Sequence, residues 1–357
     1  MNDELSWKAI FSALVAGEDL SPGQADWALR QIISGEATPA QVGGFLIAIR
    51  AKGESVTELS AFVDVLLEHS VKPPLPNDAI DIVGTGGDQL GTVNISSMAA
   101  ILVAASGYPV LKHGSRSASG KTGSSEMLEA LGVNLNLTPE QLRQVFEETG
   151  ISFFFAPLFH PALKNVGAIR RELGIPTTFN YLGPLANPVQ PVASALGVAN
   201  SVVAPLLAAE MASRGRTALV FRGSDGLDEL TTTGTSKIWL VSGTEVTEFE
   251  LDPEELGIRR ATLAQLIGGD AAENAQIARI ILDSGTGLTG EQQAIQDIVA
   301  LNAAAGIAAY ELYKNPTGFD LQVEMAKGLA LTRSAIANGN AILKLNQWVS
   351  ASQNFGE

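Results

Sequence analysis

The feature that most constrains this chain is a glycine-rich turn between a short apolar strand and a buried helix. Residues 79–83 are predicted to form the strand and residues 98–105 the helix, and the turn contains Gly84, Gly86 and Gly87. Glycine permits positive φ and lets backbone N–H groups face a ligand without interference from a Cβ atom. A helix N-terminus adds unpaired donors and a positive dipole end. The turn therefore predicts an anion site, although a glycine cluster alone more often marks an ordinary turn.

A second polar segment strengthens the anion-site interpretation. Residues 112–125 place Lys112, Arg116 and Lys121 among glycines and serines, directly after a predicted strand at residues 109–113. Ligands of α/β proteins bind beyond the carboxyl ends of parallel strands, where such loops meet. The two loops together predict a polyanion site at one edge of a sheet.

The acidic composition limits the possible partners. The chain has 38 Asp and Glu against 23 Lys and Arg, a formal charge of -15. This charge argues against nucleic acid or an anionic membrane as partner, so a phosphate must be attracted by local dipoles, local cations and a metal. The chain has no cysteine and no evident secretory signal, so we expect a cytoplasmic protein. Its longest apolar stretch, residues 98–111, is too short to span a bilayer.

The start of the chain is predicted to be a small helical domain, residues 1–72, that serves for packing. Three hydroxyl residues each stand three positions before Gln or Glu, the pattern of a capping box: Ser21, Thr38 and Ser55. Three glycines stand where helices would end: Gly17, Gly35 and Gly53. Prolines at residues 73–76 mark a boundary, because consecutive prolines enter neither a helix nor a central strand.

Beyond the prolines, strands and helices alternate. Strands are predicted at residues 79–83, 109–113, 151–156, 193–198 and 217–222. Alternation of this kind indicates an α/β domain with a mainly parallel sheet, and residues 237–241 and 245–251 predict an antiparallel hairpin extension. A helix follows Thr289, and residues 322–349 are predicted to form one further helix. The α/β domain is expected to span residues 77–357, with helices from about 165–185 joining the helical domain.

Two adjacent carboxylates follow the strand at residues 217–222. Magnesium prefers oxygen ligands and keeps several waters, so Asp228 and Glu229 suit an Mg²⁺ that also touches a diphosphate. The alternative is a solvated acidic turn, which the two nearby anion loops make less favoured. Asp88 is a weaker candidate, because an Asp that closes a glycine loop often makes only a turn hydrogen bond.

The three histidines give no catalytic triad. His69 at a helix end is explained as a cation near helix carbonyls. His113 either contacts a substrate or orders its loop, and His160, before a proline, is explained as a structural residue. Arg170 and its neighbour Arg171 could cap the carbonyls of their helix or form a salt bridge to Glu172; in the functional alternative, one of them clamps a carboxylate.

These segments together resemble the anthranilate phosphoribosyltransferases, enzymes of tryptophan biosynthesis, over nearly the whole chain. The matching residues are Gly84–Asp88, Asn94–Ser97, Lys112–Gly114, Gly123–Gly132, Arg170–Pro188 and Gly226–Glu229. The resemblance implies a homodimer with the fold of class II nucleoside phosphorylases and phosphoribosyltransferases, a small helical domain plus a large α/β domain. It also implies small-molecule substrates, phosphoribosyl diphosphate (PRPP) and anthranilate, with Mg²⁺ as cofactor.

The resemblance also implies the site residues. PRPP would be bound by Gly84, Gly87, Asp88, Thr92, Asn94, Ile95, Ser96, Ser97, Lys112, His113, Gly114, Ser115, Arg116, Ser117, Ala118, Ser119, Gly120 and Ser124. Anthranilate would be bound by Gly84, His113, Ser115, His160, Arg170 and Pro184. The metal would be held by Ser96, Asp228 and Glu229. No residue is implied as an obligatory acid or base, and His113 and Arg170 would act by positioning.

The implied reaction transfers the phosphoribosyl group to the amine of anthranilate, which gives N-(5-phosphoribosyl)anthranilate and diphosphate. Two positions depart from the family pattern: Ser115 stands where the family has Asn, and Pro176 where it commonly has Arg. A serine still donates and accepts hydrogen bonds, so activity is expected, with altered acceptor binding. Three alternatives are a pyrimidine nucleoside phosphorylase, a paralogue with another aromatic acceptor, and a non-enzymatic paralogue that binds nucleic acid.

Overall fold

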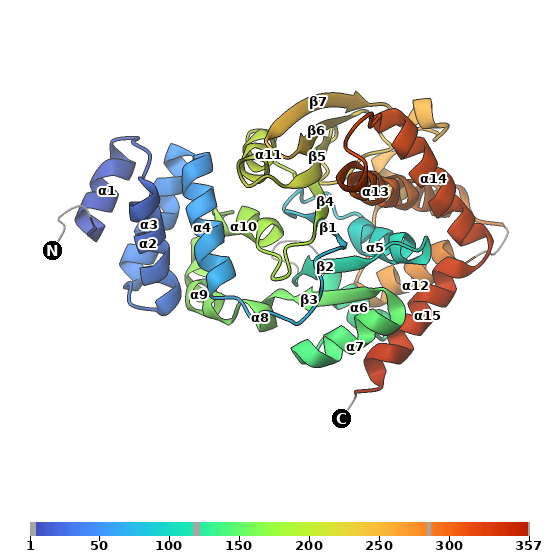
Figure 1. Ribbon diagram of the computed structural model, residues 1–357, viewed down its shortest axis with the longest axis horizontal. Coiled ribbons are helices and arrows are strands. Elements are labelled where there is room, and N and C mark those ends of the chain that lie inside the picture. Colours follow the sequence, from blue (N-terminus) through green and yellow to red (C-terminus); the bar gives the residue numbers. More distant parts are fainter. Residues whose placement is uncertain (1–4, 117–121, 284–286, 356–357) are drawn as a thin grey trace. The chain divides into compact units, whose positions relative to one another are not determined.

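The structure, a computed structural model, describes residues 5–116, 122–283 and 287–355 and divides the chain into two compact units. The first unit is Met1–Val71 together with Ala156–Pro188, and the second is Lys72–Phe155 together with Val189–Glu357. The first unit therefore takes in a segment from the middle of the sequence. In the sequence, that segment lies between two strands of the α/β unit, Ile151–Phe155 and Ala193–Gly197 (Figure 1).

The first unit is helical, and its helices begin where the capping residues predicted. Its elements are α1 (Trp7–Val15), α2 (Pro22–Ser34), α3 (Pro39–Lys52), α4 (Val56–Glu68), α8 (Ala156–Phe159), η1 (Pro161–Leu163), α9 (Lys164–Leu173) and α10 (Phe179–Leu185). Ser21, Thr38 and Ser55 each form a complete capping box with the Gln or Glu three residues later. Gly35 and Gly53 end α2 and α3 with positive φ, as expected.

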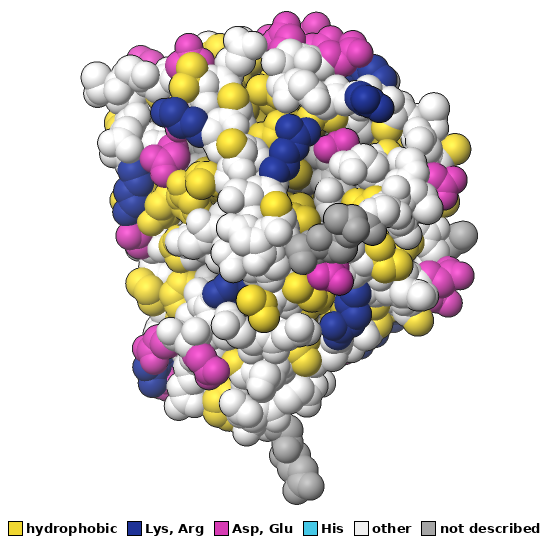
Figure 2. All heavy atoms as spheres, turned by 90° about the vertical axis from the view of Figure 1, so that its right-hand side faces the viewer, with side chains coloured by type: hydrophobic (Ala, Val, Ile, Leu, Met, Phe, Trp, Pro, Cys, Tyr) yellow, Lys and Arg dark blue, Asp and Glu magenta, His cyan; other side chains and the backbone are white. Residues whose placement is uncertain are grey.

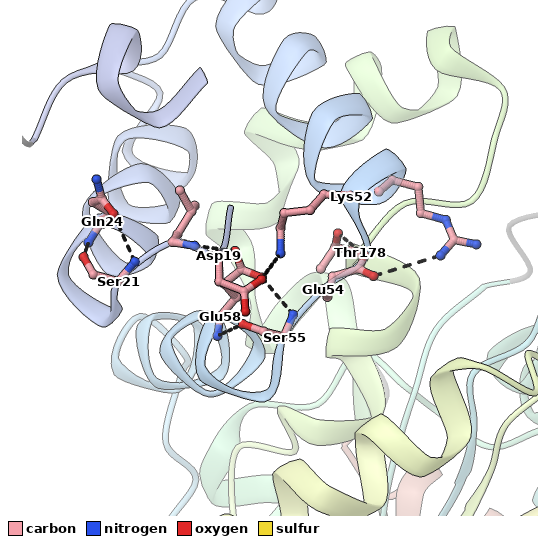
Figure 3. Close-up of polar contacts among 10 residues, drawn as sticks. Asp19, Ser21, Gln24, Lys52, Glu54, Ser55, Glu58 and Thr178 are labelled. Atoms are coloured by element: carbon pink, nitrogen blue, oxygen red, sulfur yellow. Dashed lines mark hydrogen bonds and ion pairs between the residues drawn. The ribbon is translucent and has the colours of Figure 1, made fainter. Parts of the chain in front are cut away.

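An ion cluster that is buried at Lys52 and Glu58 and exposed at Asp19 joins the ends of these helices (Figure 3). Lys52 Nζ lies 2.9 Å from Glu58 Oε2 and 2.5 Å from Asp19 Oδ1, and the side chains of Lys52 and Glu58 are 4% and 0% exposed. Glu58 also accepts hydrogen bonds from the backbone N–H groups of Leu20 and Ser55, both at 2.8 Å. Every oxygen of this buried carboxylate is thus satisfied, the condition for a buried charge to be tolerated.

In the second unit, the described residues form one seven-stranded sheet in the order β3-β2-β1-β4-β5-β6-β7. The strands are β1 (Ile80–Gly84), β2 (Val110–Gly114), β3 (Ile151–Phe155), β4 (Ala193–Gly197), β5 (Thr217–Gly223), β6 (Ser236–Ser242) and β7 (Glu245–Leu251). Neighbours from β3 to β5 pair in parallel, whereas β6 and β7 pair antiparallel. The predicted fold class is confirmed, including the antiparallel hairpin at the sheet edge.

Helices cover both faces of this sheet. They are α5 (Ile95–Ala105), α6 (Ser124–Leu131), α7 (Pro139–Thr149), α11 (Val203–Ser213), η2 (Pro253–Leu256), η3 (Leu263–Leu266), α12 (Ala271–Leu282), α13 (Gly290–Lys314), α14 (Leu321–Ala337) and α15 (Asn340–Gln353). The connection from β1 to β2 runs toward the β3 edge of the sheet, and the connection from β4 to β5 runs toward the β7 edge. Right-handed crossovers therefore place α5 and α11 on opposite faces, and the alanine-rich α13 packs against α5 (Figure 1).

The prediction of a single helix over residues 322–349 is wrong. The segment forms two helices, α14 and α15, which are separated by Asn338 and Gly339. Gly339 has φ 75°, a left-handed conformation that the α-helix does not contain. The apolar periodicity continues through this turn because both helices bury residues against the same unit, so periodicity alone did not reveal the break.

Charged side chains of both signs are scattered over the face of the molecule that Figure 2 shows. Lys and Arg stand singly or in small groups between Asp and Glu there and form no continuous stripe. This face therefore has no broad basic region, in line with the acidic net charge of -15 of the whole chain. No helix among the described residues combines the length and apolar character that a membrane crossing requires.

Candidate active site

The predicted glycine loop lies at the switch point of the sheet. β1 and β4 are neighbours, and the chain leaves them toward opposite edges, so their carboxyl ends flank the position where ligands of open α/β sheets bind. Gly84 and Gly197, the last residues of the two strands, pair in register. Asp228 follows β5 and lies against both glycines: a Cβ atom on Gly84 would collide with Asp228 Oδ2, and one on Gly197 with the Asp228 backbone oxygen.

The role predicted for Gly84 needs correction. Gly86 and Gly87 have φ of 65° and 84°, as expected for a turn that only glycine tolerates, but Gly84 is not among the residues with positive φ. Glycine is required at position 84 because Asp228 fills the place of a side chain. The Gly86 N–H donates to Asp228 Oδ2 at 2.7 Å, so the glycine loop and this carboxylate form one structure.

The second carboxylate, Glu229, lies at the start of α5. The Ser96 N–H, in the first turn of that helix, donates to Glu229 Oε1 at 3.1 Å. Negative groups are stabilised there by the helix dipole and by unpaired N–H donors. Two of the backbone donors predicted to face a ligand, those of Gly86 and Ser96, therefore donate to the protein's own carboxylates.

Three carboxyl groups repel one another at this position. Burial, together with the negative charge of Asp88, raises the pKa of Asp228 to about 7. Burial and the charge of Asp228 raise the pKa of Glu229 well above its usual value, and burial raises that of Asp88. Asp88 also accepts a turn hydrogen bond from the Leu90 N–H at 3.2 Å, as expected for an Asp that closes a glycine loop. A cation would relieve this repulsion.

Lys112 supplies one positive charge from the neighbouring strand. It lies on β2, is 2% exposed, and its Nζ donates to the carbonyl of Ile82 and to Ser96 Oγ, the latter at 3.2 Å. Burial lowers the pKa of its ammonium group, which the charges of Asp81, Glu229 and Asp228 oppose. Lys112 therefore faces the carboxylate pair from inside the sheet and is not a mobile surface cation.

The donor set fits a magnesium ion. Asp228, Glu229 and Ser96 offer two carboxylates and a hydroxyl, all of them hard oxygen ligands. Within the described ranges no group of three or more His, Cys, Asp or Glu is arranged to hold a metal. Mg²⁺ is usually bound through one or two carboxylates, with waters and substrate phosphates as its other ligands, so two crowded carboxylates match its needs.

The remaining residues predicted to bind PRPP make contacts of their own. Thr92 bridges to Ile267, and Asn94 Nδ2 donates to the Thr122 carbonyl at 3.0 Å. Ser124 Oγ donates to the Ser115 carbonyl at 3.2 Å, next to Gly114, where a Cβ would collide with Ser124.

The other predicted residues differ in exposure. Arg116 is 54% exposed and pairs with Glu129 on α6 at 3.2 Å. Ser97 is buried in α5, as is Ile95, whereas Gly87 is exposed in its loop. Ser117, Ala118, Ser119 and Gly120 lie outside the described residues.

Two buried asparagines support the site, and the sequence interpretation missed both. Asn274 Nδ2 donates to Asn94 Oδ1 at 2.9 Å, and Asn302 donates to and accepts from the backbone of Leu230, next to Glu229, at 2.9 Å. Both side chains are at most 1% exposed. An available signal was the amide of Asn302 within the alanine-rich helix α13, because a buried polar group in an apolar stretch must find partners.

The predicted histidines are held by backbone contacts. The His113 N–H donates to Asp81 Oδ1 at 3.1 Å, and the imidazole is buried on β2. In the helical unit, His160 is 3% exposed and its Nε2 donates to the Ala186 carbonyl at 2.8 Å, as expected for a structural histidine. His69 ends α4 with Nδ1 2.9 Å from the Val65 carbonyl oxygen.

Arg170 lies in the last turn of α9 and faces the start of α10. Its Nη2 donates to Asn180 Oδ1 at 3.2 Å, and its guanidinium lies 5.6 Å from the ring centre of Phe179. Burial lowers its pKa. No carboxylate of a described residue pairs with Arg170, so the alternative of a salt bridge to Glu172 is not observed in that part of the chain. Pro184 lies inside α10.

Comparison with known protein families identifies the class of enzyme to which this chain belongs. Residues 76–342 match the model of the glycosyl transferase family a/b domain, and residues 8–70 match that of the helical bundle domain of the same family. The chain is thus a glycosyltransferase built of these two parts.

Individual relatives narrow the class to one family. An anthranilate phosphoribosyltransferase of Leifsonia xyli subsp. xyli is 49% identical, over 99% of this chain and 100% of the relative. The crystal structure of the Thermus thermophilus enzyme of the same name is 36% identical with a TM-score of 0.85, covering 96% of this chain and 99% of that one. The Saccharomyces cerevisiae enzyme in complex with PRPP and Mg is 27% identical with a TM-score of 0.86, covering 99% and 100%. The chain belongs to the anthranilate phosphoribosyltransferase family.

Proposed function

We propose that this protein transfers the phosphoribosyl group of PRPP to the amine of anthranilate and serves tryptophan biosynthesis. In this reaction the amine nitrogen forms a bond to ribose C1, the bond from C1 to the diphosphate oxygen breaks, and diphosphate leaves with the bonding electrons. The nitrogen then loses a proton to solvent. The family membership and the chemistry of the residues at the switch point support this proposal.

The observation that carries the proposal is the contact of Asp228 with the glycine loop. Asp228 Oδ2 accepts from the Gly86 N–H at 2.7 Å, and its neighbour Glu229 accepts from the Ser96 N–H. We propose that Ser96, Asp228 and Glu229 hold Mg²⁺, which supplies positive charge to the diphosphate when bound. Asp228 and Glu229 would then turn to the ion and release the two backbone donors for phosphate oxygens.

The other donor residues act by binding. Lys112 would keep a positive charge beside the diphosphate, and Asn94, held by Asn274, would fix the backbone at Thr122. Backbone N–H groups and fixed charges of this kind stabilise the charge that develops on a leaving group, because they need no reorganisation during the reaction.

For the acceptor, we propose that Arg170 binds the carboxylate of anthranilate. A half-buried guanidinium whose hydrogen-bond partner is a neutral amide keeps its full charge available for an anion. Gly84, His113, Ser115, His160 and Pro184 are the other residues proposed to contact the aromatic acceptor. An aromatic amine is uncharged at physiological pH, so its lone pair is free and no protein base is required; the contribution of the protein is orientation.

The test is consumption of anthranilate, followed by its fluorescence, with PRPP and Mg²⁺. We expect turnover that depends on all three components. The matched assay is phosphate-dependent cleavage of pyrimidine nucleosides, which should show none. Nucleoside cleavage without PRPP-dependent turnover would replace this proposal with the phosphorylase alternative.

We also propose that the protein is a cytoplasmic homodimer. The family resemblance supports the dimer, and a chain without cysteine has no need of an oxidising compartment. Light scattering of the purified protein should give twice the chain mass of 37.3 kDa. A mass of one chain at micromolar concentration would contradict the dimer.

A further inference from the structure

The helical unit contains a connected set of contacts that ends on Arg170. Asn180 Oδ1 accepts from Arg170 Nη2 at 3.2 Å and from the Thr177 N–H at 2.9 Å. Both partners are donors, so the amide oxygen must face them. Asn180 therefore fixes the guanidinium of Arg170 to the backbone at the start of α10.

The start of α10 is in turn fixed by a buried carboxylate on the connection between α3 and α4. Thr178 Oγ1 donates to Glu54 Oε1 at 2.6 Å, and the side chain of Glu54 is 2% exposed (Figure 3). Thr178 is the N-cap residue of α10, yet its side chain makes no capping bond to that helix. A hydroxyl that would ordinarily cap its own helix is directed to Glu54 instead.

A second contact from α3 reaches the same helix. Arg50, one turn before Glu54, places its guanidinium 5.5 Å from the ring centre of Tyr181 and its Nη1 4.0 Å from Glu54 Oε2. Arg50 at the end of α3 and Glu54 on the connection that follows thus hold the start of α10 at Tyr181 and at Thr178, on either side of Asn180. The expectation that the N-terminal helices serve only for packing does not account for this.

We propose that Asn180 is a positioning residue for Arg170, and that Glu54, through Thr178, sets the place of Asn180. This inference rests on the proposed role of Arg170 in binding the acceptor carboxylate. The amide is the suitable group, because it orients the guanidinium by a hydrogen bond and leaves its charge uncompensated. A carboxylate at position 180 would form an ion pair with Arg170 and compete with the acceptor.

The decisive variant is Asn180→Asp. We expect the KM for anthranilate to rise roughly tenfold or more, because a charge-assisted pair is stronger than a neutral hydrogen bond. The kcat at saturating anthranilate and the KM for PRPP should stay close to wild type. The matched control is Asn165→Asp, which makes the same change of charge on α9, where Asn165 Nδ2 donates to the Ile33 carbonyl at 2.7 Å and not to Arg170.

Glu54 is tested by a pair of variants. Glu54→Gln keeps an oxygen that accepts from Thr178 and should keep the wild-type KM for anthranilate, whereas Glu54→Ala should raise it. Calorimetric binding of PRPP with Mg²⁺ checks that each variant is folded. A rise in the KM for anthranilate with both variants would indicate that the negative charge of Glu54 is required. That result would overturn the positioning role.

The outcomes separate this inference from the proposed function. If the wild type does not consume anthranilate, the proposed function fails and this inference with it. If the wild type is active and Asn180→Asp has the wild-type KM for anthranilate, or Asn165→Asp raises it equally, only the inference is overturned.

Discussion

Gly84 and Asp228 are in such close contact that position 84 has no room for a side chain. A Cβ atom there would collide with Asp228 Oδ2, the same oxygen that accepts from the Gly86 N–H at 2.7 Å. The two residues are far apart in the sequence, and their contact brings the glycine loop after β1 to the carboxylates after β5.

Gly84→Ala should displace Asp228 from the glycine loop. A displacement of about 1 Å at a reacting centre can cost about 100-fold in rate, and we expect a loss of this size in kcat/KM for PRPP. The control is Gly290→Ala at the start of α13, where a Cβ meets nothing within 4 Å. A wild-type kcat/KM for PRPP in Gly84→Ala would show that the reaction does not require Asp228 in this position.

Asp228→Asn should change how stability depends on pH. The pKa of Asp228 is about 7 in the folded protein against an ordinary 3.8, so between these values the folded state holds a proton that the unfolded chain has lost. Without metal, the wild type should therefore lose stability as pH rises from about 4 to 7. Asparagine cannot ionise, so the variant should have the higher Tm above pH 7 and lose this advantage below pH 4. Thermal melts in chelator decide this, and parallel pH profiles would contradict it.

Asp228→Ala should nearly abolish turnover, because it removes a proposed ligand of Mg²⁺. The same variant should no longer show heat of Mg²⁺-dependent PRPP binding by calorimetry. An unchanged rate with Asp228→Ala would show that the metal assignment is wrong.

Ser115→Asn should keep or improve turnover. Ser115 is exposed, and the interactions described for it use its backbone carbonyl, which accepts from Ser124 Oγ, so a larger side chain is accommodated. An amide there would offer a further donor and acceptor to the aromatic amine. Steady-state kinetics with anthranilate provide the measurement, and a strong loss of activity would count against this placement of the acceptor.

Asn302→Ala should weaken both the fold and the metal-dependent activity. The side chain makes hydrogen bonds at 2.9 Å to Leu230 N, Leu230 O and Ile298 O and is 0% exposed. Unsatisfied buried groups cost about 1–3 kcal/mol each, so we expect a loss of roughly 2–4 kcal/mol in the free energy of unfolding. Asn315→Ala, on an exposed side chain, is the control and should change stability by no more than about 0.5 kcal/mol.

Local features of the fold were predictable from the sequence. The capping boxes at Ser21, Thr38 and Ser55 and the apolar runs of the strands depend on neighbouring residues, and the structure agrees with both. The site depends on contacts between distant residues. Sequence spacing does not reveal that Asp228 occupies the Cβ position of Gly84, or that Asn180 faces Arg170, because each is set by how whole elements pack.

The insertion of Ala156–Pro188 between two strands of the sheet has a consequence for how such an enzyme can evolve. Arg170, His160 and Pro184 all belong to this one insert, which follows β3 and precedes β4 in the sequence, whereas the carboxylates and the glycine loop belong to the other unit. If Arg170 binds the acceptor as proposed, exchange of a single contiguous stretch of gene would change part of the acceptor site, while the carboxylates and the glycine loop would be inherited unchanged.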